Sequence, residues 1–147
     1  MGTVKELLRA RRTQSVLTIP GDATVLEAAR QMAQHELGAV VVAEGEVPVG
    51  LLTERDVLAR VVAVERDAGA TPVAAVMSRP VRTIRLGASI AEARRAMVAE
   101  GRRHLVVVRE DGGLAGVLSM RDLLHHEVAE QKQTLGFLKD YFFDYYR

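Results

Sequence analysis

The chain has 147 residues, of which 48% are hydrophobic and 27% are charged, and its 20 basic residues nearly balance its 19 acidic ones. This composition is typical of a globular protein, and a formal net charge of +1 argues against the basic surface that binds nucleic acid or an anionic membrane. The chain has no cysteine, which excludes disulfides and thiolate metal sites and fits a reducing cytoplasm.

Periodicity and capping residues divide the first half of the chain into short elements. Thr24 and Glu27 have the spacing of a capping box and predict a helix start. The continuous β-branched run at 39–43 predicts a strand that is buried on both faces. The expected elements are, in order, a helix over 4–12, a strand over 16–19, a helix from 24, strands over 39–43 and 47–52, and a helix over 56–64.

After a polar, turn-rich stretch at 65–72, the same order of elements recurs. Ser89 repeats the cap residue Thr24 at an offset of 65 (89 − 24), and Gly116 answers Gly50 at an offset of 66 (116 − 50). A unit of about 60 residues buries too little surface to be comfortably stable alone, so two copies should share a core. The predicted boundaries are a first repeat over 1–64, a linker over 65–72, a second repeat over 73–128 and a helical tail over 129–147.

These elements predict an α/β (α+β) fold of two tandem β-α-β-β-α repeats, packed sheet to sheet with pseudo-twofold symmetry, plus a C-terminal aromatic helix. All six aromatic residues lie in the last eleven positions, 137–147. The expected helix over 127–147 is apolar on two sides, so it should pack on its own core or on another subunit. We favour a homodimer that this tail assists, and a regulated protein partner that docks on the tail is the other possibility.

One heptad occurs twice, at 50–56 and 116–122, with the form Gly, two aliphatic residues, a hydroxyl residue, any residue, Arg and Asp. The hydroxyl and the carboxylate are three residues apart, as in a capping box. The start of a helix also presents unpaired N–H groups and a partial positive charge, which suit a phosphate. The residues by themselves allow a cap, a ligand site or both.

Taken together, residues 4–128 resemble a pair of cystathionine-β-synthase (CBS) domains, a Bateman module of the stand-alone bacterial type. The resemblance rests on the repeated heptad, on the helices that open Thr/Ser-x-x-Glu-Ala after a Thr-Ile pair, and on the run Arg-His-Leu-Val-Val-Val at 103–108. It implies a non-catalytic regulatory module that senses energy state or a metabolite. The implied ligand is an adenosine compound, AMP, ADP, ATP or S-adenosylmethionine, bound in clefts between the repeats.

The resemblance also implies a role for individual residues. The ribose hydroxyls would be held by Asp56 and Asp122, because an ionised carboxylate can accept two charge-assisted hydrogen bonds. The phosphate would be held by Thr53, Arg55, Arg103, His104, Ser119 and Arg121. The adenine would be clasped by Thr18, Ile19, Ala39, Val40, Thr83, Ile84 and Leu105.

These residues would form two unequal clefts. The first would combine Ser119, Arg121 and Asp122 with Thr18, Ile19, Ala39 and Val40, beside Arg103 and His104. The mirror cleft would combine Thr53, Arg55 and Asp56 with Thr83, Ile84, His104 and Leu105. The second repeat has Arg103-His104 where the first has Gly38-Ala39. We therefore expect Asp122 to mark the higher-affinity site for a charged nucleotide.

Other functions fit the residues less well. The chain has no Gly-x-Ser-x-Gly motif, no phosphate-binding Gly-x-x-x-x-Gly-Lys loop and no cysteine nucleophile, so we expect no enzyme and no cofactor beyond the regulatory ligand. His125 and His126 are adjacent on a helix and point apart, so we expect no metal site. The apolar runs are too short to span a bilayer and the N-terminus lacks a signal sequence, which predicts a cytoplasmic protein. A dimerisation or docking scaffold with degenerate clefts stays open as the alternative, ahead of nucleic-acid binding.

Overall fold

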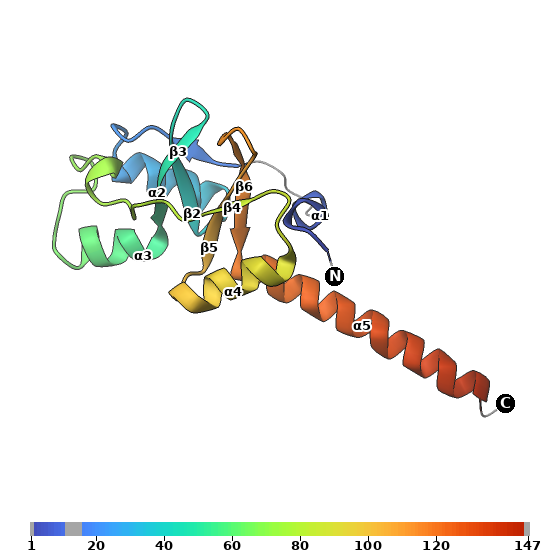
Figure 1. Cartoon of the computed structure of the whole chain (residues 1–147). Coiled ribbons are helices and arrows are strands. Elements are labelled where there is room, and N and C mark those ends of the chain that lie inside the picture. The colour runs from blue at the N-terminus through green and yellow to red at the C-terminus, as the bar shows by residue number, and fades with distance from the viewer. Residues whose placement is uncertain (1, 11–15, 146–147) are drawn as a thin grey trace.

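The structure is a computed structural model that describes residues 2–10 and 16–145, with side chains as far as residue 136. Its elements form two similar halves followed by one long helix (Figure 1). The first half contains α1 (Val4–Arg9), β1 (Thr18–Ile19), α2 (Val25–Gln34), β2 (Ala39–Glu44), β3 (Val47–Thr53), α3 (Glu54–Val57) and the π-turn η1 (Leu58–Val62). The second half contains the 3-10 turn η2 (Val73–Ala75), β4 (Thr83–Arg85), α4 (Ile90–Glu100), β5 (His104–Val108), β6 (Leu114–Ser119) and α5 (Met120–Tyr145).

Each half builds a three-stranded sheet of the same topology. In one sheet β1 pairs in parallel with β2, which pairs antiparallel with β3, and β4, β5 and β6 repeat this order. Even the irregularity is repeated, because the register shifts at Val42/Ala43 in one sheet and at Val107/Val108 in the other. The predicted α/β fold of two tandem repeats is confirmed.

The alternation of side chains along the strands creates three apolar layers. Val40 and Val42 face the helices of the first half, and Leu105 and Val107 face those of the second half. The opposite faces of the two sheets meet each other in a middle layer that contains Ala39, Val41, Leu51 and Val106. Strands that are apolar on both faces are therefore required in the centre of each sheet, as the β-branched runs predicted.

The segments that precede the two halves are exchanged between the cores. Val4 is fully buried in the core of the second half, and its N–H donates to Ala88 O at 2.9 Å. Val73 is fully buried in the core of the first half, and its N–H donates to Ala23 O at 2.8 Å. Each core is completed by a segment from the other side of the molecule, so the two halves depend on each other for stability.

Capping residues start the helices as predicted. Thr24 and Glu27 form a full capping box at α2, and Ser89 accepts the Glu92 N–H at α4. The first helix extends only to Arg9, and residues 11–12 of the predicted range lie outside the described residues. The helix after β3 begins at Glu54 rather than Asp56, because Thr53 is its N-cap, and it widens into the π-turn at Leu58.

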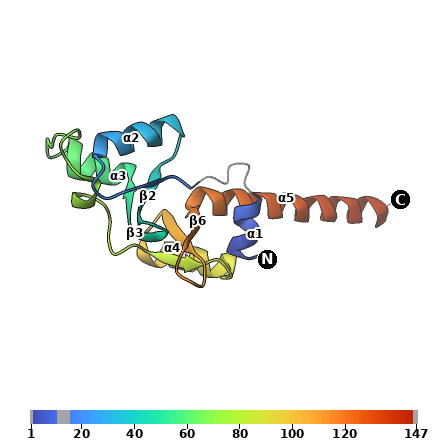
Figure 2. The same ribbon diagram turned by 90° about the horizontal axis from the view of Figure 1, so that it is seen from above.

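The C-terminal helix α5 differs from the prediction in where it begins. It starts at Met120, directly after β6, and continues to Tyr145. Figures 1 and 2 show it projecting away from both sheets, with the C-terminus at its far end. The aromatic side chains of 137–147, to which we assigned a role in self-association, lie outside the described residues. Along the part of the chain that the structure describes, no helix is long and apolar enough to cross a membrane.

Candidate functional site

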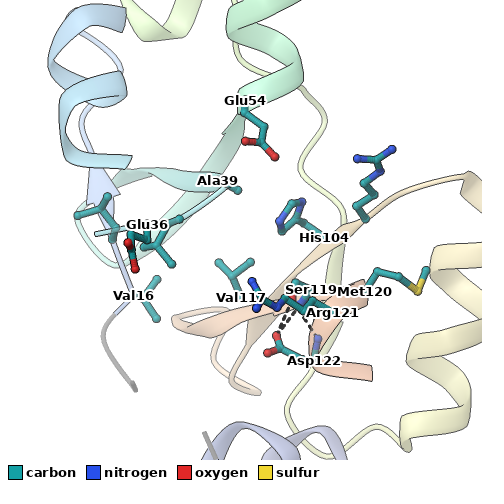
Figure 3. A pocket seen from close by; sticks show the side chains of 14 residues that line it. Val16, Glu36, Ala39, Glu54, His104, Val117, Ser119, Met120, Arg121 and Asp122 are labelled. Atoms are coloured by element: carbon teal, nitrogen blue, oxygen red, sulfur yellow. Dashed lines mark hydrogen bonds between the residues drawn. The ribbon is translucent and has the colours of Figure 1, made fainter. Parts of the chain in front are cut away.

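A cavity of about 440 Å³ opens between the two halves, next to the junction of β6 and α5 (Figure 3). This volume lies within the range of small-molecule sites. One wall comes from the first half and the other from the second half. The lining residues are Val16, Leu17, Glu36, Leu37, Gly38, Ala39, Glu54, Arg103, His104, Val117, Ser119, Met120, Arg121 and Asp122.

Strand alternation decides which side chains reach the cavity. Ala39 and His104 are the first residues of β2 and β5, and both lie on the sheet faces that meet in the middle layer. Their neighbours Val40 and Leu105 point the opposite way, into the two helix-covered cores. The cavity is thus the open end of the interface between the sheets, where the paired strands stop.

The junction of β6 and α5 brings a carboxylate and a hydroxyl to the cavity wall. Asp122 accepts the Ser119 N–H at 2.8 Å and the Ser119 hydroxyl at 2.9 Å, and its own N–H donates to Ser119 Oγ at 3.1 Å. The heptad therefore does act as a helix cap. It also leaves Asp122 on the surface of the cavity, beside Arg121, so a cap and a ligand site are compatible at the same residues.

His104 lies half-buried in the cavity, between Glu54 and the group formed by Ser119 and Arg121 (Figure 3). Burial away from water lowers the pKa of this imidazole below its ordinary value of 6.5. The negative charges of Glu54 and Asp122 oppose that effect, and the positive charge of Arg103 adds to it. His104 is therefore mostly neutral at pH 7 and becomes easier to protonate when an anion approaches.

Two arginines lie on one wall of the cavity, beside Asp122, and two glutamates lie on the other wall. Arg103 and Arg121 come from the second half, and both are exposed. Glu36 and Glu54 come from the first half. A Cβ added at Gly38 would lie 3.2 Å from Glu54 Oε1, so glycine allows the Glu54 side chain to sit over this turn. The arrangement offers one wall to an anionic group and keeps the other unfavourable for it.

Six of the residues predicted for the first cleft line this cavity, namely Ala39, Arg103, His104, Ser119, Arg121 and Asp122. The other three do not. Ile19 and Val40 are 4% and 1% exposed in the core of the first half, and Thr18 is exposed outside the cavity. They lie one or two positions away from Leu17, just before β1, and from Ala39 at the start of β2, which do line the cavity.

The residues predicted for the mirror cleft are dispersed. Leu105 is 2% exposed in the core of the second half, and His104, which was predicted for both clefts, lines the cavity at Asp122. Thr83 and Ile84 line a different cavity of about 830 Å³, together with Lys5 and Arg109. Neither of these cavities is lined by Thr53, Arg55 or Asp56.

Asp56, the counterpart of Asp122, is only 6% exposed. Its carboxylate accepts the Thr53 N–H at 2.9 Å and the hydroxyl of Ser78 at 2.9 and 3.0 Å. Arg60 Nε lies 3.9 Å from the same carboxylate. The two copies of the heptad therefore share a cap geometry but have different surroundings.

Sequence reasoning missed the lining residues Val16, Leu17, Glu36, Leu37, Gly38, Glu54, Val117 and Met120. Alternation along β6 puts Val117 on the same sheet face as Ser119, so it could have been found, whereas Leu17 precedes β1 and packs in part against the core of the first half. The local sequence does not indicate that Glu36 and Glu54 line the cavity, because their position depends on how the segments before β2 and after β3 pack against the second half. Among the described residues, no group of three or more His, Cys, Asp or Glu side chains gathers as a metal site.

Comparison with known proteins decides the family. The sequence pattern of the CBS domain matches residues 4–63 and again residues 73–129. The chain belongs to the CBS domain family. The CBS domain-containing protein YhcV of Bacillus subtilis is 34% identical over 131 residues, which are 89% of each chain. An uncharacterised protein of Methanopyrus kandleri is 35% identical over 119 residues, and this chain spans 60% of its length.

Solved CBS structures share the fold. A protein with CBS domains from Burkholderia ambifaria matches with a TM-score of 0.82 and 33% identity, over 88% of this chain and 96% of that one. The CBS domain protein PAE2072 from Pyrobaculum aerophilum, which was solved in complex with AMP, matches with a TM-score of 0.73 and 31% identity, over 82% and 88% of the two chains. One solved relative of this fold, the Pyrobaculum aerophilum protein, thus holds AMP.

Proposed function

We propose that this chain is a regulatory CBS module that binds an adenosine-containing nucleotide in the cavity at Asp122. The observation that carries the proposal is the convergence there of a carboxylate, a hydroxyl and two arginines, opposite a wall on which Leu17 and Ala39 are apolar. The AMP complex of the Pyrobaculum aerophilum relative supports an adenosine ligand. The role is binding and regulation rather than catalysis.

In this proposal, different lining residues bind the ribose, the adenine and the phosphate. Asp122 accepts hydrogen bonds from the ribose hydroxyls, which are strengthened by its charge. Leu17 and Ala39 cover the adenine from the first repeat. Arg103 and Arg121 hold the phosphate beside the N-terminal end of α5, where the helix dipole also favours negative charge.

The mechanism that we propose for regulation is a population shift. A ligand that touches both repeats favours the arrangement that closes the cavity, and it can shift an equilibrium only by its difference in affinity between two states. A micromolar ligand supplies about 8 kcal/mol of total binding free energy. Only the part that differs between the states acts on a partner or on a second subunit.

The test is binding of AMP, ADP, ATP and S-adenosylmethionine to the full chain, measured by thermal shift and by titration calorimetry. We expect at least one of them to stabilise the protein. Asp122→Asn should weaken that ligand about 10- to 100-fold, because it removes charge-assisted hydrogen bonds. The control is Asp22→Asn, which lies in the loop before α2 and outside the cavity. Failure of all four compounds to bind would favour the scaffold alternative.

We also propose that the module self-associates. Several large apolar side chains on the helices of the two halves are exposed, and they come from η1, α4 and the first turns of α5. They are Leu58, Val62, Val98, Leu124 and Val128, with exposed fractions of 49 to 69%. Such a surface is typical of an interface. Sedimentation of the wild type against Val98→Asp and Leu124→Asp tests this, and a wild-type monomer at micromolar concentration would contradict it.

A further inference from the structure

The carboxylate of Asp56 is occupied by the chain itself. The hydroxyl of Ser78 lies 2.9 Å from one oxygen and 3.0 Å from the other, so it faces the edge that a ribose diol would use. The Thr53 N–H takes one of the remaining positions, and only 6% of Asp56 is exposed. A second nucleotide could reach Asp56 only by displacing Ser78.

Ser78 is held in this place by further contacts. Its N–H donates to Leu51 O at 2.8 Å, and the Leu51 N–H donates back to Ser78 O at 3.1 Å. The guanidinium of Arg60, on the π-turn η1, donates to the carbonyls of Val76 and Met77, each at 3.1 Å. These bonds fix both the backbone and the hydroxyl of the segment 76–78.

The apolar part of the segment closes the same space. Met77 is 8% exposed and packs into the core of the first repeat. A Cβ placed at Gly50, the first residue of the heptad, would collide with the Met77 side chain. Glycine at this position therefore leaves room for the Met77 side chain against β3.

We propose that residues 76–78 form an internal latch that keeps the Asp56 position closed, so that each chain binds one nucleotide. Ser78 substitutes for a ribose hydroxyl and controls whether a second position opens. Because the competitor is attached to the protein, it is always present at the carboxylate, unlike a free ligand. The nucleotide part of this inference rests on the proposed function at Asp122, whereas the latch itself does not.

The latch also joins the two repeats on one side of the molecule. Ser78 leads into β4 of the second repeat, whereas Asp56, Arg60 and Leu51 belong to the first. The repeats are thus tied together at Asp56, and the nucleotide cavity lies at the other copy of the heptad. Movement between the repeats should therefore pivot about the latch.

The first experiment is titration calorimetry of the full chain with AMP. We expect one AMP per chain in the wild type and in Ser78→Thr, which keeps the hydroxyl. We expect two per chain in Ser78→Ala, and one again in the double variant Ser78→Ala/Asp56→Asn. Ser89→Ala is the matched control, because it removes a serine hydroxyl that caps α4 elsewhere in the fold. Two AMP per wild-type chain, or one per chain in Ser78→Ala, would overturn the proposal.

The second experiment needs no ligand. Hydrogen exchange at the amides of Leu51 and Ser78 should rise roughly tenfold in Ser78→Ala, because one hydrogen bond to a charged group is lost. Unchanged exchange there would overturn the latch. If no variant binds AMP, the proposed function fails while the exchange result still decides the latch. Arg60→Gln, which releases the carbonyls of 76 and 77, serves as the second variant if Ser78→Ala does not fold, with the same increase expected.

Discussion

Ala39 and His104 hold equivalent places in the two repeats, and they line the same cavity from opposite sheets. Ala39 is paired with Thr53 across β2 and β3, and His104 is paired with Ser119 across β5 and β6. The two positions are equivalent in the fold, but their side chains give them different chemical properties. The small side chain leaves room for a flat apolar group, while the imidazole adds a group that can gain a positive charge near a phosphate.

Replacing Ala39 with Leu should fill the cavity. Ala39 is 8% exposed on the cavity wall, so three additional carbon atoms would occupy the space that we assign to the adenine. We expect AMP affinity to fall at least about tenfold, with a change in the free energy of unfolding below about 1.5 kcal/mol, because the cavity can accommodate the larger side chain. Calorimetry and chemical denaturation measure the two effects. Ala33→Leu, on the exposed side of α2, is the control; equal affinity in both variants would contradict the assignment.

The pKa of His104 predicts how stability depends on pH. Burial lowers the pKa in the folded protein, and unfolding returns it to about 6.5. The unfolded chain therefore binds more protons than the folded chain in this pH range. The contribution of neutral His104 to the free energy of unfolding is complete above about pH 6.5, and it is lost as the pH falls from there toward the folded pKa. Denaturation midpoints between about pH 8 and pH 5.5 should show this loss in the wild type and less of it in His104→Gln. His35→Gln, at the exposed end of α2, should keep the wild-type slope.

A bound phosphate should raise the pKa of His104, because a nearby anion stabilises the imidazolium. AMP binding is then expected to take up protons near neutral pH, whereas adenosine, which has no phosphate, is not. Calorimetry in buffers of different ionisation enthalpy counts the protons. His104→Gln should remove the part of the uptake that exceeds the titration of the AMP phosphate itself. Equal uptake in the variant and the wild type would place the phosphate away from His104.

The carboxylate of Glu54 should limit the number of phosphates that the cavity accepts. Its charge acts on His104 and lies on the wall opposite Arg121. We expect Glu54→Gln to improve ATP affinity roughly 3- to 10-fold and AMP affinity less, because repulsion grows with the ligand's charge. The difference should shrink at high salt. Glu44→Gln, an exposed residue at the end of β2, should change neither affinity.

Because the leading segments are exchanged, a substitution in the segment that precedes one repeat should destabilise the core of the other repeat. Val4 and Val73 are both fully buried, in the cores of the second and first repeats respectively. Replacing either with Ala should lower the free energy of unfolding by roughly 2 kcal/mol. Hydrogen exchange should accelerate first in α4 and β5 for Val4→Ala, and in α2 and β2 for Val73→Ala. The reverse pattern would mean that each segment supports its own repeat.

Much of the site could be predicted because the heptad and the strand run are local patterns. Ser119 and Asp122 are three residues apart, so their geometry is set within one turn of helix. The predictions at Ile19, Val40 and Leu105, whose side chains lie in the cores rather than in the cavity, met the opposite situation. A fully apolar strand gives no sign of which face is which, and a displacement of one residue moves a side chain from the cavity to the core.

By itself, the sequence determined the two repeats, their order of elements, the capped helices and the residues that meet at the start of α5. These features depend on contacts a few residues apart, or on alternation along a single strand. Only the tertiary structure decided that the leading segments are exchanged, and that Ser78 closes over Asp56 while a cavity lies at Asp122. Ser78 and Asp56 are 22 positions apart. Their contact depends on how the segment 76–78 pairs with β3, and nothing in the local sequence pattern of either residue indicates it.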